Sequence, residues 1–239
     1  MIRGAQQRIT VPSVVAAFMY ATATVVWLGV TGPAGNFAGL VPAYMVAVSI
    51  GSVFISGVAN QVTWSRAWFA GPAYYYALHP SLFGWLAGTV AVGAATDMLD
   101  GLVARQLREE SRFGGALDPV VDGLFYGSVG VGLWLSGLVT SWVALLVGLR
   151  YALPAAAGAV LLLGGKQPEL RHTFFGQLST VVIGISLGGV ALLKATAHNP
   201  DLLVSLAYVA IPVTAVLTFV NLFVGRLRSA RRVDSAWPR

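Results

Sequence analysis

Four aspartates recur at short, regular intervals beside an apolar run of the sequence. Asp97 and Asp100 are three residues apart, and Asp118 and Asp122 are four residues apart. Residues at these separations share one face of an α-helix, so each pair places two carboxylates about one turn apart. The whole chain has only 9 Asp and Glu residues, and carboxylates at membrane depth are costly unless something positive compensates them. The spacing therefore predicts that these side chains hold a cation.

Divalent metal ions are the simplest compensation for such a cluster. Two ions roughly 3.5–4 Å apart would balance four carboxylates, and oxygen ligands select Mg²⁺ or Mn²⁺ over Zn²⁺. Gly101 and Ala104 keep the helix face open to a bulky group, and Gly114 does the same for the loop. The planar guanidinium of Arg105 suits phosphate oxygens. Together these residues indicate a site where metal ions and phosphate groups meet.

The elements that carry these residues must lie in a membrane. The 239 residues are 56% hydrophobic and 10% charged, with a mean hydropathy of +0.75, which excludes an ordinary soluble domain. The 28 glycines predict close packing between helices. We therefore predict an all-α fold, a polytopic membrane helix bundle. Apolar runs of about 20 residues, long enough to cross a bilayer, occur near 11–31, 37–59, 81–100, 119–138, 140–163, 174–193 and 202–225.

Cationic clusters orient the predicted bundle, since loops rich in Lys and Arg stay cytoplasmic. The clusters are Arg105, Arg108 and Arg112, then Lys166 and Arg171, then Arg226, Arg228, Arg231 and Arg232. They place the aspartates at the cytoplasmic face of the plasma membrane, and the Ala, Gly and Val content suggests a bacterial source. Arg3 and Arg8 also favour a cytoplasmic N-terminus, which seven spans do not permit. Either the stretch 68–79 re-enters or crosses as a short irregular segment, or residues 1–13 lie flat at the interface.

Several classes of protein are disfavoured by the same composition. The net charge of +6 does not indicate nucleic-acid binding, because the basic residues flank spans instead of forming one stripe with aromatics. No cysteine is present, which excludes a thiol nucleophile and a thiolate metal site. A cation transporter or an ion-binding membrane protein remains an alternative, although acids gathered at one membrane face favour an enzyme. No linker or repeat divides residues 1–239, so we expect one domain.

The aspartates belong to a longer pattern that resembles a family signature. The motif D-x-x-D-G-x-x-A-R-x8-G-x3-D-x3-D is met at Asp97, Asp100, Gly101, Ala104, Arg105, Gly114, Asp118 and Asp122. The chain thereby resembles the CDP-alcohol phosphotransferase (CDP-alcohol phosphatidyltransferase) family. The resemblance implies a six-helix core, here 81–225, after divergent N-terminal spans in 1–80 that add about one span. It also implies a homodimer that transfers a phosphatidyl-type group from a CDP-linked lipid to an alcohol and releases CMP.

The resemblance also implies roles for single residues. Asp97, Asp100 and Asp118 would bind two Mg²⁺ or Mn²⁺ ions, and Asp122 would be both a ligand and the base that accepts the proton of the acceptor hydroxyl. Residues expected to contact or line the site of the CDP-diacylglycerol donor are Gly101, Ala104, Arg105, Ser111 and Gly114.

A second, smaller resemblance concerns the acceptor alcohol. The L-D-P-x-x-D run at 117–122 resembles the phosphatidylglycerophosphate synthase and cardiolipin synthase branch, which implies glycerol-3-phosphate or phosphatidylglycerol as acceptor. Inositol phosphate or another polar alcohol remains an alternative. The run from Thr10 to Ser13 resembles the T-x-P-N start of that branch, with Ser13 in place of Asn and Met19 where an Arg is expected. Gly123 stands where a Lys or Arg often follows the last Asp.

One further charged residue interrupts an apolar run. Arg150 lies between Leu149 and Tyr151, and an arginine within a span is a functional hypothesis by default. It would bind the phosphate of the acceptor, or it would pair with one of the motif aspartates. Lys166, Arg171 and His172 are secondary candidates for the same cytoplasmic entrance, or simply a topology signal.

Overall fold

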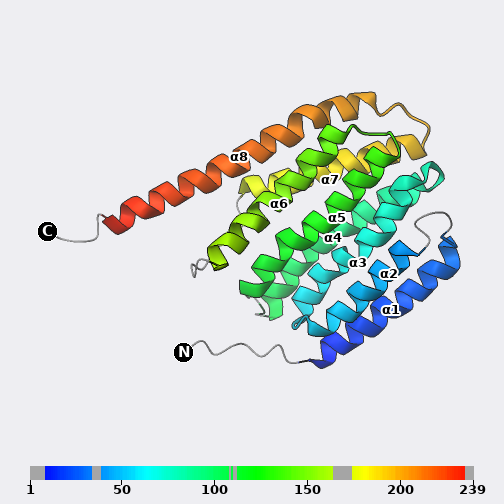
Figure 1. Cartoon of the computed structure of the whole chain (residues 1–239), viewed down its shortest axis with the longest axis horizontal. Helices are drawn as coiled ribbons and strands as arrows, with labels where there is room; N and C mark the ends of the chain where they lie inside the picture. Colours follow the sequence, from blue (N-terminus) through cyan, green and yellow to red (C-terminus); the bar gives the residue numbers. More distant parts are fainter. Residues whose placement is uncertain (1–8, 34–38, 108, 110–111, 164–173, 235–239) are drawn as a thin grey trace.

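The computed structural model describes residues 9–33, 39–107, 109, 112–163 and 174–234. Ser111, Lys166, Arg171 and His172, which the sequence singled out, lie outside these residues. The described residues form eight α-helices and two short 3₁₀-helices and contain no strand (Figure 1). The α-helices are α1 (Val11–Thr31), α2 (Leu40–Gly51), α3 (Val58–Leu78), α4 (Phe83–Leu107), α5 (Arg112–Leu135), α6 (Ser141–Leu163), α7 (Phe174–Ala195) and α8 (Asp201–Asp234), with η1 (Ser52–Phe54) and η2 (Pro80–Leu82) between them.

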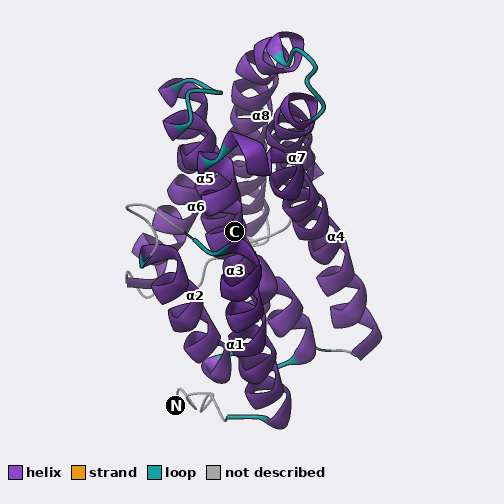
Figure 2. Cartoon of the chain, turned by 90° about the vertical axis from the view of Figure 1, so that its right-hand side faces the viewer, coloured by secondary structure: helices purple, strands orange, loops and turns teal. Residues whose placement is uncertain are grey.

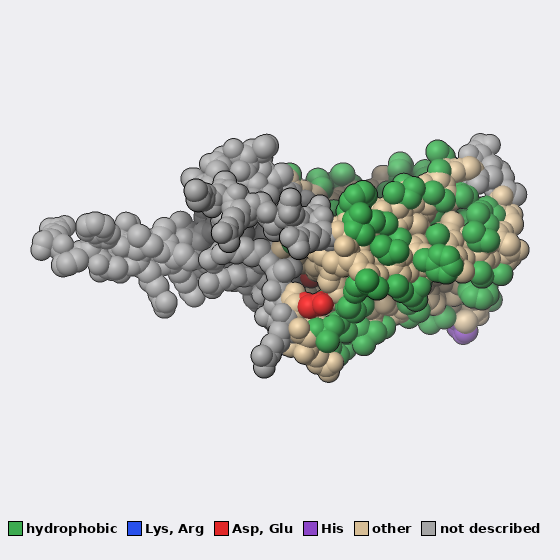
Figure 3. Space-filling view, turned by 90° about the horizontal axis from the view of Figure 1, so that it is seen from below, with side chains coloured by type: hydrophobic (Ala, Val, Ile, Leu, Met, Phe, Trp, Pro, Cys, Tyr) green, Lys and Arg blue, Asp and Glu red, His purple; other side chains and the backbone are tan. Residues whose placement is uncertain are grey.

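The prediction of an all-α membrane bundle is confirmed. Four segments are long and apolar enough to cross a membrane by length and composition: Val11–Thr31, Pro80–Leu107, Gly176–Ala195 and Asp201–Thr218. In Figure 3, hydrophobic side chains are spread over the whole described part of the visible face, as expected for a surface in contact with lipid.

The region between 37 and 79 differs from the prediction. The expected span 37–59 is wrong, because α2 ends at Gly51 and the chain turns at Gly57, whose φ is +91°. The expected irregular segment at 68–79 is also wrong, because residues 58–78 form one regular helix, α3. Hydropathy does not reveal α3, since its polar side chains are buried against other helices rather than exposed to lipid.

The described residues contain eight α-helices, one more than the seven expected spans. Figure 1 shows the start of α1 and the end of α8 at the same end of the bundle, as an even number of antiparallel passes requires. Arg3 and Arg8, which favour a cytoplasmic N-terminus, lie outside the described residues.

Helix α3 occupies the middle of the bundle, in contact with α1, α2, α4 and α5 (Figure 2). Glycines allow its neighbours to approach closely. A Cβ atom on Gly93 of α4 would lie 2.5 Å from the ring of Phe125 in α5, and one on Gly132 of α5 would lie 2.5 Å from Ala77 of α3. Real Cβ atoms do not approach that closely, so these helices pack at distances that only glycine permits. The tight packing predicted from the glycine content is confirmed at these contacts.

The first two helices are attached to α3 by hydrogen bonds of aromatic side chains. Each bond satisfies an N–H or O–H group that would otherwise be buried without a partner. The bonds run from Tyr20 Oη to the Gln61 carbonyl (2.6 Å), from Trp27 Nε1 to Tyr76 Oη (2.8 Å), from Tyr44 Oη to the Ala67 carbonyl (2.7 Å), from Trp64 Nε1 to the Val48 carbonyl (3.0 Å) and from Trp68 Nε1 to Thr24 Oγ1 (2.9 Å).

Candidate functional site

The four motif aspartates converge on one buried guanidinium group. It belongs to Arg66 of α3, whose side chain is 0% exposed. Its nitrogens lie within ion-pair distance of every one of the four carboxylates. The distances are 3.2 Å from Nη1 to Asp97 Oδ1, 2.9 Å from Nη1 to Asp100 Oδ2, 3.3 Å from Nη2 to Asp118 Oδ1 and 3.0 Å from Nε to Asp122 Oδ1.

Three helices meet at this cluster. The C-terminal part of α4 carries Asp97 and Asp100, and the N-terminal part of α5 carries Asp118 and Asp122. The two pairs face each other across Arg66, as the three- and four-residue spacings indicate. Pro119 is the eighth residue of α5, past its first turn, so its missing N–H removes one i→i−4 hydrogen bond from the helix.

The carboxylates differ in their access to the surroundings. The Asp97 side chain is 41% exposed and Asp118 is 21% exposed, while Asp100 and Asp122 are 8% and 12% exposed. Figure 3 shows a small acidic patch on the surface at this end of the bundle. Asp100 is held from a second side, because Thr63 Oγ1 of α3 donates a hydrogen bond of 2.8 Å to Asp100 Oδ2. Asp97 is thus the most exposed carboxylate of the cluster, and Asp100 and Asp122 are the most buried.

The chemistry of these side chains fits a divalent cation. All four are carboxylates, the oxygen ligands that Mg²⁺ and Mn²⁺ prefer. Asp122 Oδ1 is buried and has no hydrogen-bond donor among the described residues, because Arg66 Nε faces it at 3.0 Å without hydrogen-bond geometry. However, no three acidic or histidine side chains among the described residues are arranged to hold one metal ion. The carboxylates are instead arranged around Arg66.

Two predicted donor-binding residues lie side by side next to the cluster. A Cβ atom on Gly101 would lie 3.5 Å from Arg105 Nη1, so the exposed Arg105 side chain folds back over Gly101 one turn earlier in α4. Ala104 and Gly114 are half-buried in α4 and α5. The structure therefore presents a cationic group beside the acidic cluster, at the same end of the bundle.

Arg150 lies near the site but does not join the cluster. Among the described residues it has no ion pair with an aspartate; its Nε donates to Ser179 Oγ and its Nη2 to the Gly176 carbonyl, both at 3.1 Å. The side chain is buried at 8% exposure, so a positive charge of α6 is held by neutral partners of α7. The alternative that Arg150 pairs with a motif aspartate is not what the structure shows.

The departure at Gly123 has a packing reason. A Cβ atom on Gly123 would lie 2.8 Å from Tyr151 Cβ of α6, so the Lys or Arg often found there does not fit this contact. The same contact places Arg150, the neighbour of Tyr151, at the depth of Asp122, the neighbour of Gly123.

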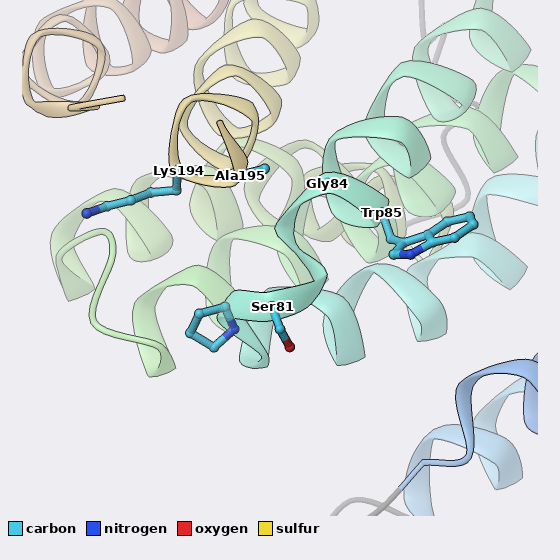
Figure 4. Close-up of a pocket in the computed structure, with 6 residues that line it drawn as sticks. Ser81, Gly84, Trp85, Lys194 and Ala195 are labelled. Carbon is cyan, nitrogen blue, oxygen red and sulfur yellow. The ribbon is translucent and has the colours of Figure 1, made fainter. Parts of the chain in front are cut away.

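A cavity of about 480 Å³ at the start of α4 and the end of α7 contains none of these residues (Figure 4). Lys194 is the charged residue among those that line it, and no carboxylate accompanies it. The cavity is formed by the N-terminal end of α4, away from the aspartates at its C-terminal end, and by the C-terminal end of α7. The described residues that line the cavity include no carboxylate or histidine, so it is not a candidate metal site.

Arg66 is the central residue that the sequence analysis missed. The sequence did contain a signal for it, because Arg66 is the single charged residue in the 21 residues that form α3. A charge in such a stretch indicates a function by default. The start pattern of the branch instead places its arginine at the position of Met19. The resemblance of Thr10–Ser13 is explained locally, since Thr10 and Ser13 form a capping box at the start of α1.

Comparison with known proteins identifies the family of the chain. The sequence model described as CDP-alcohol phosphatidyltransferase matches residues 56–220, more than half of the chain. The match covers α3 to α7 and the first part of α8, includes Arg66 and begins after α2. Members of this family are transferases that use a divalent metal.

Individual relatives carry two kinds of name. A relative from Mycobacterium tuberculosis, assigned as a cardiolipin synthase, is 34% identical over 110 residues, which are 46% of this chain and 52% of that protein. The cardiolipin synthase (CMP-forming) of Streptomyces coelicolor is 31% identical over 42% of this chain and 46% of its own length. The CDP-diacylglycerol–glycerol-3-phosphate 3-phosphatidyltransferase of Yersinia pestis is 30% identical over 54% of this chain and 70% of its own length. The chain thus spans about half the length of the first two relatives. With its complete motif and its matching six-helix region, the chain belongs to the CDP-alcohol phosphatidyltransferase family.

Proposed function

We propose that the protein transfers a phosphatidyl group from CDP-diacylglycerol to an alcohol and releases CMP. One observation carries the proposal: four aspartates from two helices converge at one end of a membrane bundle, beside the exposed Arg105. A group of acids near one end of the bundle suits a donor whose diphosphate lies at the membrane surface. It is less suited to a cation transporter, whose site is expected near the midplane.

Each motif residue has a separate task in this proposal. Asp97, Asp100, Asp118 and Asp122 would hold the divalent cations, which stabilise negative charge on the diphosphate. Arg105 binds donor phosphate oxygens through its planar guanidinium, over the open helix face at Gly101. Ala104 and Gly114 leave room for the nucleotide, and Ser111 would contact the donor.

Asp122 acts as the general base. Its Oδ1 is buried and accepts no hydrogen bond from the described residues, so it can accept the proton of the acceptor hydroxyl. The hydroxyl oxygen then forms a bond to the phosphorus that carries diacylglycerol, and the bond from that phosphorus to the oxygen of CMP breaks. CMP leaves with the electron pair of the broken bond, and no covalent enzyme intermediate is required.

Arg150 is proposed to bind the phosphate of the acceptor. The side chain is buried, lies at the depth of Asp122 and has neutral hydrogen-bond partners in α7, so an anionic acceptor would supply its missing counter-charge. Glycerol-3-phosphate and phosphatidylglycerol both carry such a phosphate. The names of the relatives, which specify glycerol-3-phosphate in one case and cardiolipin in the others, favour these two acceptors.

The setting of the reaction is part of the proposal. We place the site at the cytoplasmic face of a bacterial plasma membrane, because the Arg-rich clusters follow α4, α6 and the membrane part of α8. We further propose that residues 1–239 act as one transmembrane domain and that two copies associate as a homodimer, as the family resemblance implies.

The test is a turnover assay with the purified chain. Labelled CDP-diacylglycerol is incubated with Mg²⁺ or Mn²⁺ and with glycerol-3-phosphate, phosphatidylglycerol, inositol-1-phosphate or serine. CMP release that requires both a metal and one phosphate-bearing acceptor is the expected result. Absence of CMP release with every acceptor, from a preparation that melts cooperatively, would contradict the proposal.

A matched pair of variants separates the base from a general charge effect. Asp122→Asn should lower the rate of CMP release by about 100-fold or more, the usual contribution of a general base. Asp201→Asn removes an exposed aspartate at the other end of the bundle and should leave the rate unchanged. Equal rates for the two variants would refute the role of Asp122.

A further inference from the structure

Arg66 has contacts that the reaction described above does not use. It is the central residue of the acidic cluster, it comes from α3 rather than from the motif helices, and it is fully buried. A buried arginine must be paired, and a buried carboxylate must be paired as well. Arg66 and the four aspartates meet both needs in one group.

The geometry of the guanidinium assigns a different nitrogen to each part of the cluster. Nη1 contacts the α4 pair, Asp97 and Asp100, while Nη2 contacts Asp118 and Nε contacts Asp122 of α5. Because the guanidinium is planar and rigid, it fixes the separation of the two carboxylate pairs. A lysine has one nitrogen at its tip and cannot reach all four side chains in this way.

The charge of Arg66 has a second consequence. Four negative charges face one positive charge, so the cluster keeps a net negative charge that attracts further cations. Arg66 nevertheless repels any divalent cation that comes to the same oxygens, and at a few ångströms such repulsion is large in a poorly solvated site. An incoming metal ion must also share or take carboxylate oxygens that now face the guanidinium.

We propose that Arg66 is a built-in cation that positions the four aspartates and competes with divalent metal ions for them, and thereby sets the metal affinity of the site. The inference rests on the proposed function, in which these aspartates bind the metal. Arg66 is a positioning residue in this scheme, because it acts on the substrates through the carboxylates.

The test measures metal binding without donor or acceptor. Free Mn²⁺ is followed by electron paramagnetic resonance in a titration of the purified full chain in detergent, and melting is recorded with EDTA and with Mn²⁺. Arg66→Met keeps the length of the side chain and removes its charge. It should bind Mn²⁺ about 10-fold or more tightly than the wild type because the repulsion is gone. It should also melt at a lower temperature in EDTA and gain a larger increase on addition of Mn²⁺.

Two further variants make the result specific. Arg66→Lys keeps the charge and loses the planar fork, so its Mn²⁺ affinity should stay near that of the wild type while its melting temperature in EDTA falls. Lys194→Met removes an exposed cation from the C-terminal end of α7, beside the cavity of Figure 4, and should change neither quantity.

The outcomes separate the two proposals. Mn²⁺ affinity of Arg66→Met that equals or falls below that of the wild type overturns the inference about Arg66. A wild type that melts cooperatively but binds no Mn²⁺ overturns the metal site of the proposed function instead. If Arg66→Met cannot be purified even with Mn²⁺, the lysine variant decides, and wild-type melting of Arg66→Lys in EDTA overturns the positioning role.

Discussion

Replacing Thr63 by valine tests whether the support behind the acidic cluster matters for turnover. Thr63 Oγ1 donates to Asp100 Oδ2 at 2.8 Å, and both residues are buried. The same carboxylate oxygen also accepts a hydrogen bond from Arg66 Nη1 at 2.9 Å. Valine has nearly the shape of threonine, so the substitution removes the O–H donor without opening a cavity. Asp100 then keeps its ion pair but loses one of the two bonds that fix its orientation.

The expected magnitude follows from two independent estimates. A hydrogen bond to a charged group contributes about 1.5–3 kcal/mol, and about 1.4 kcal/mol corresponds to a factor of ten, which gives a loss of about 10- to 150-fold. Partners that hydrogen-bond to metal-binding side chains typically account for about 10- to 100-fold in metal affinity or activity. We therefore expect kcat/KM for CMP release by Thr63→Val to fall about 10- to 100-fold.

The assay compares this variant with two controls. Thr63→Ser keeps a hydroxyl and should retain most of the activity. Thr214→Val removes an equally buried hydroxyl that donates only a local bond to the Ala210 and Ile211 carbonyls of α8, and should act like the wild type. A loss smaller than about threefold in Thr63→Val would be less than one charged hydrogen bond contributes, and the reasoning about Asp100 would be wrong.

Three other substitutions address packing, loop anchoring and the acceptor. Gly93→Ala should destabilise the protein by about 1–3 kcal/mol, because its Cβ would collide with a fully buried phenyl ring of α5; Gly127→Ala, with no atom within 4 Å of its Cβ, should not, and melting curves in detergent compare the two. Glu109→Ala should lower stability by about 1 kcal/mol, because Glu109 accepts a 3.0 Å bond from a backbone N–H in the first turn of α3; unchanged melting would show that this bond contributes nothing. Arg150→Met should raise KM for glycerol-3-phosphate about 10-fold or more while KM for CDP-diacylglycerol stays the same, since one charge-assisted contact to the acceptor is lost; parallel increases in both values would argue against an acceptor-specific role.

The sequence was informative where chemistry depends on local spacing. The intervals from Asp97 to Asp100 and from Asp118 to Asp122 indicated two carboxylate pairs on facing helices, and the structure brings all four to one guanidinium. The apolar runs at 11–31 and 174–193 correspond closely to α1 and α7. In each case the information lies within one helix, where period and hydropathy are sufficient.

The sequence was misleading where a helix is covered by protein instead of lipid. Helix α3 carries Gln61, Thr63 and Arg66 on buried positions and has Pro72 inside it, so a search for apolar runs divides it between a false span and an irregular segment. The partners of Arg66 are 31 to 56 residues away along the chain, and local patterns do not report such distant contacts.

The aromatic hydrogen bonds between the first two helices and α3 limit how the protein can be shortened. A shortened version without residues 11–51 would keep the whole region that matches the family. It would also leave Trp68 and Tyr76 facing acyl chains without the partners that Thr24 and Trp27 now supply, and hydrocarbon offers no replacement for them. The N-terminal pair of helices thus shields the helix that carries Arg66 from lipid, and a shortened version of this protein would need a redesigned α3 rather than a simple deletion.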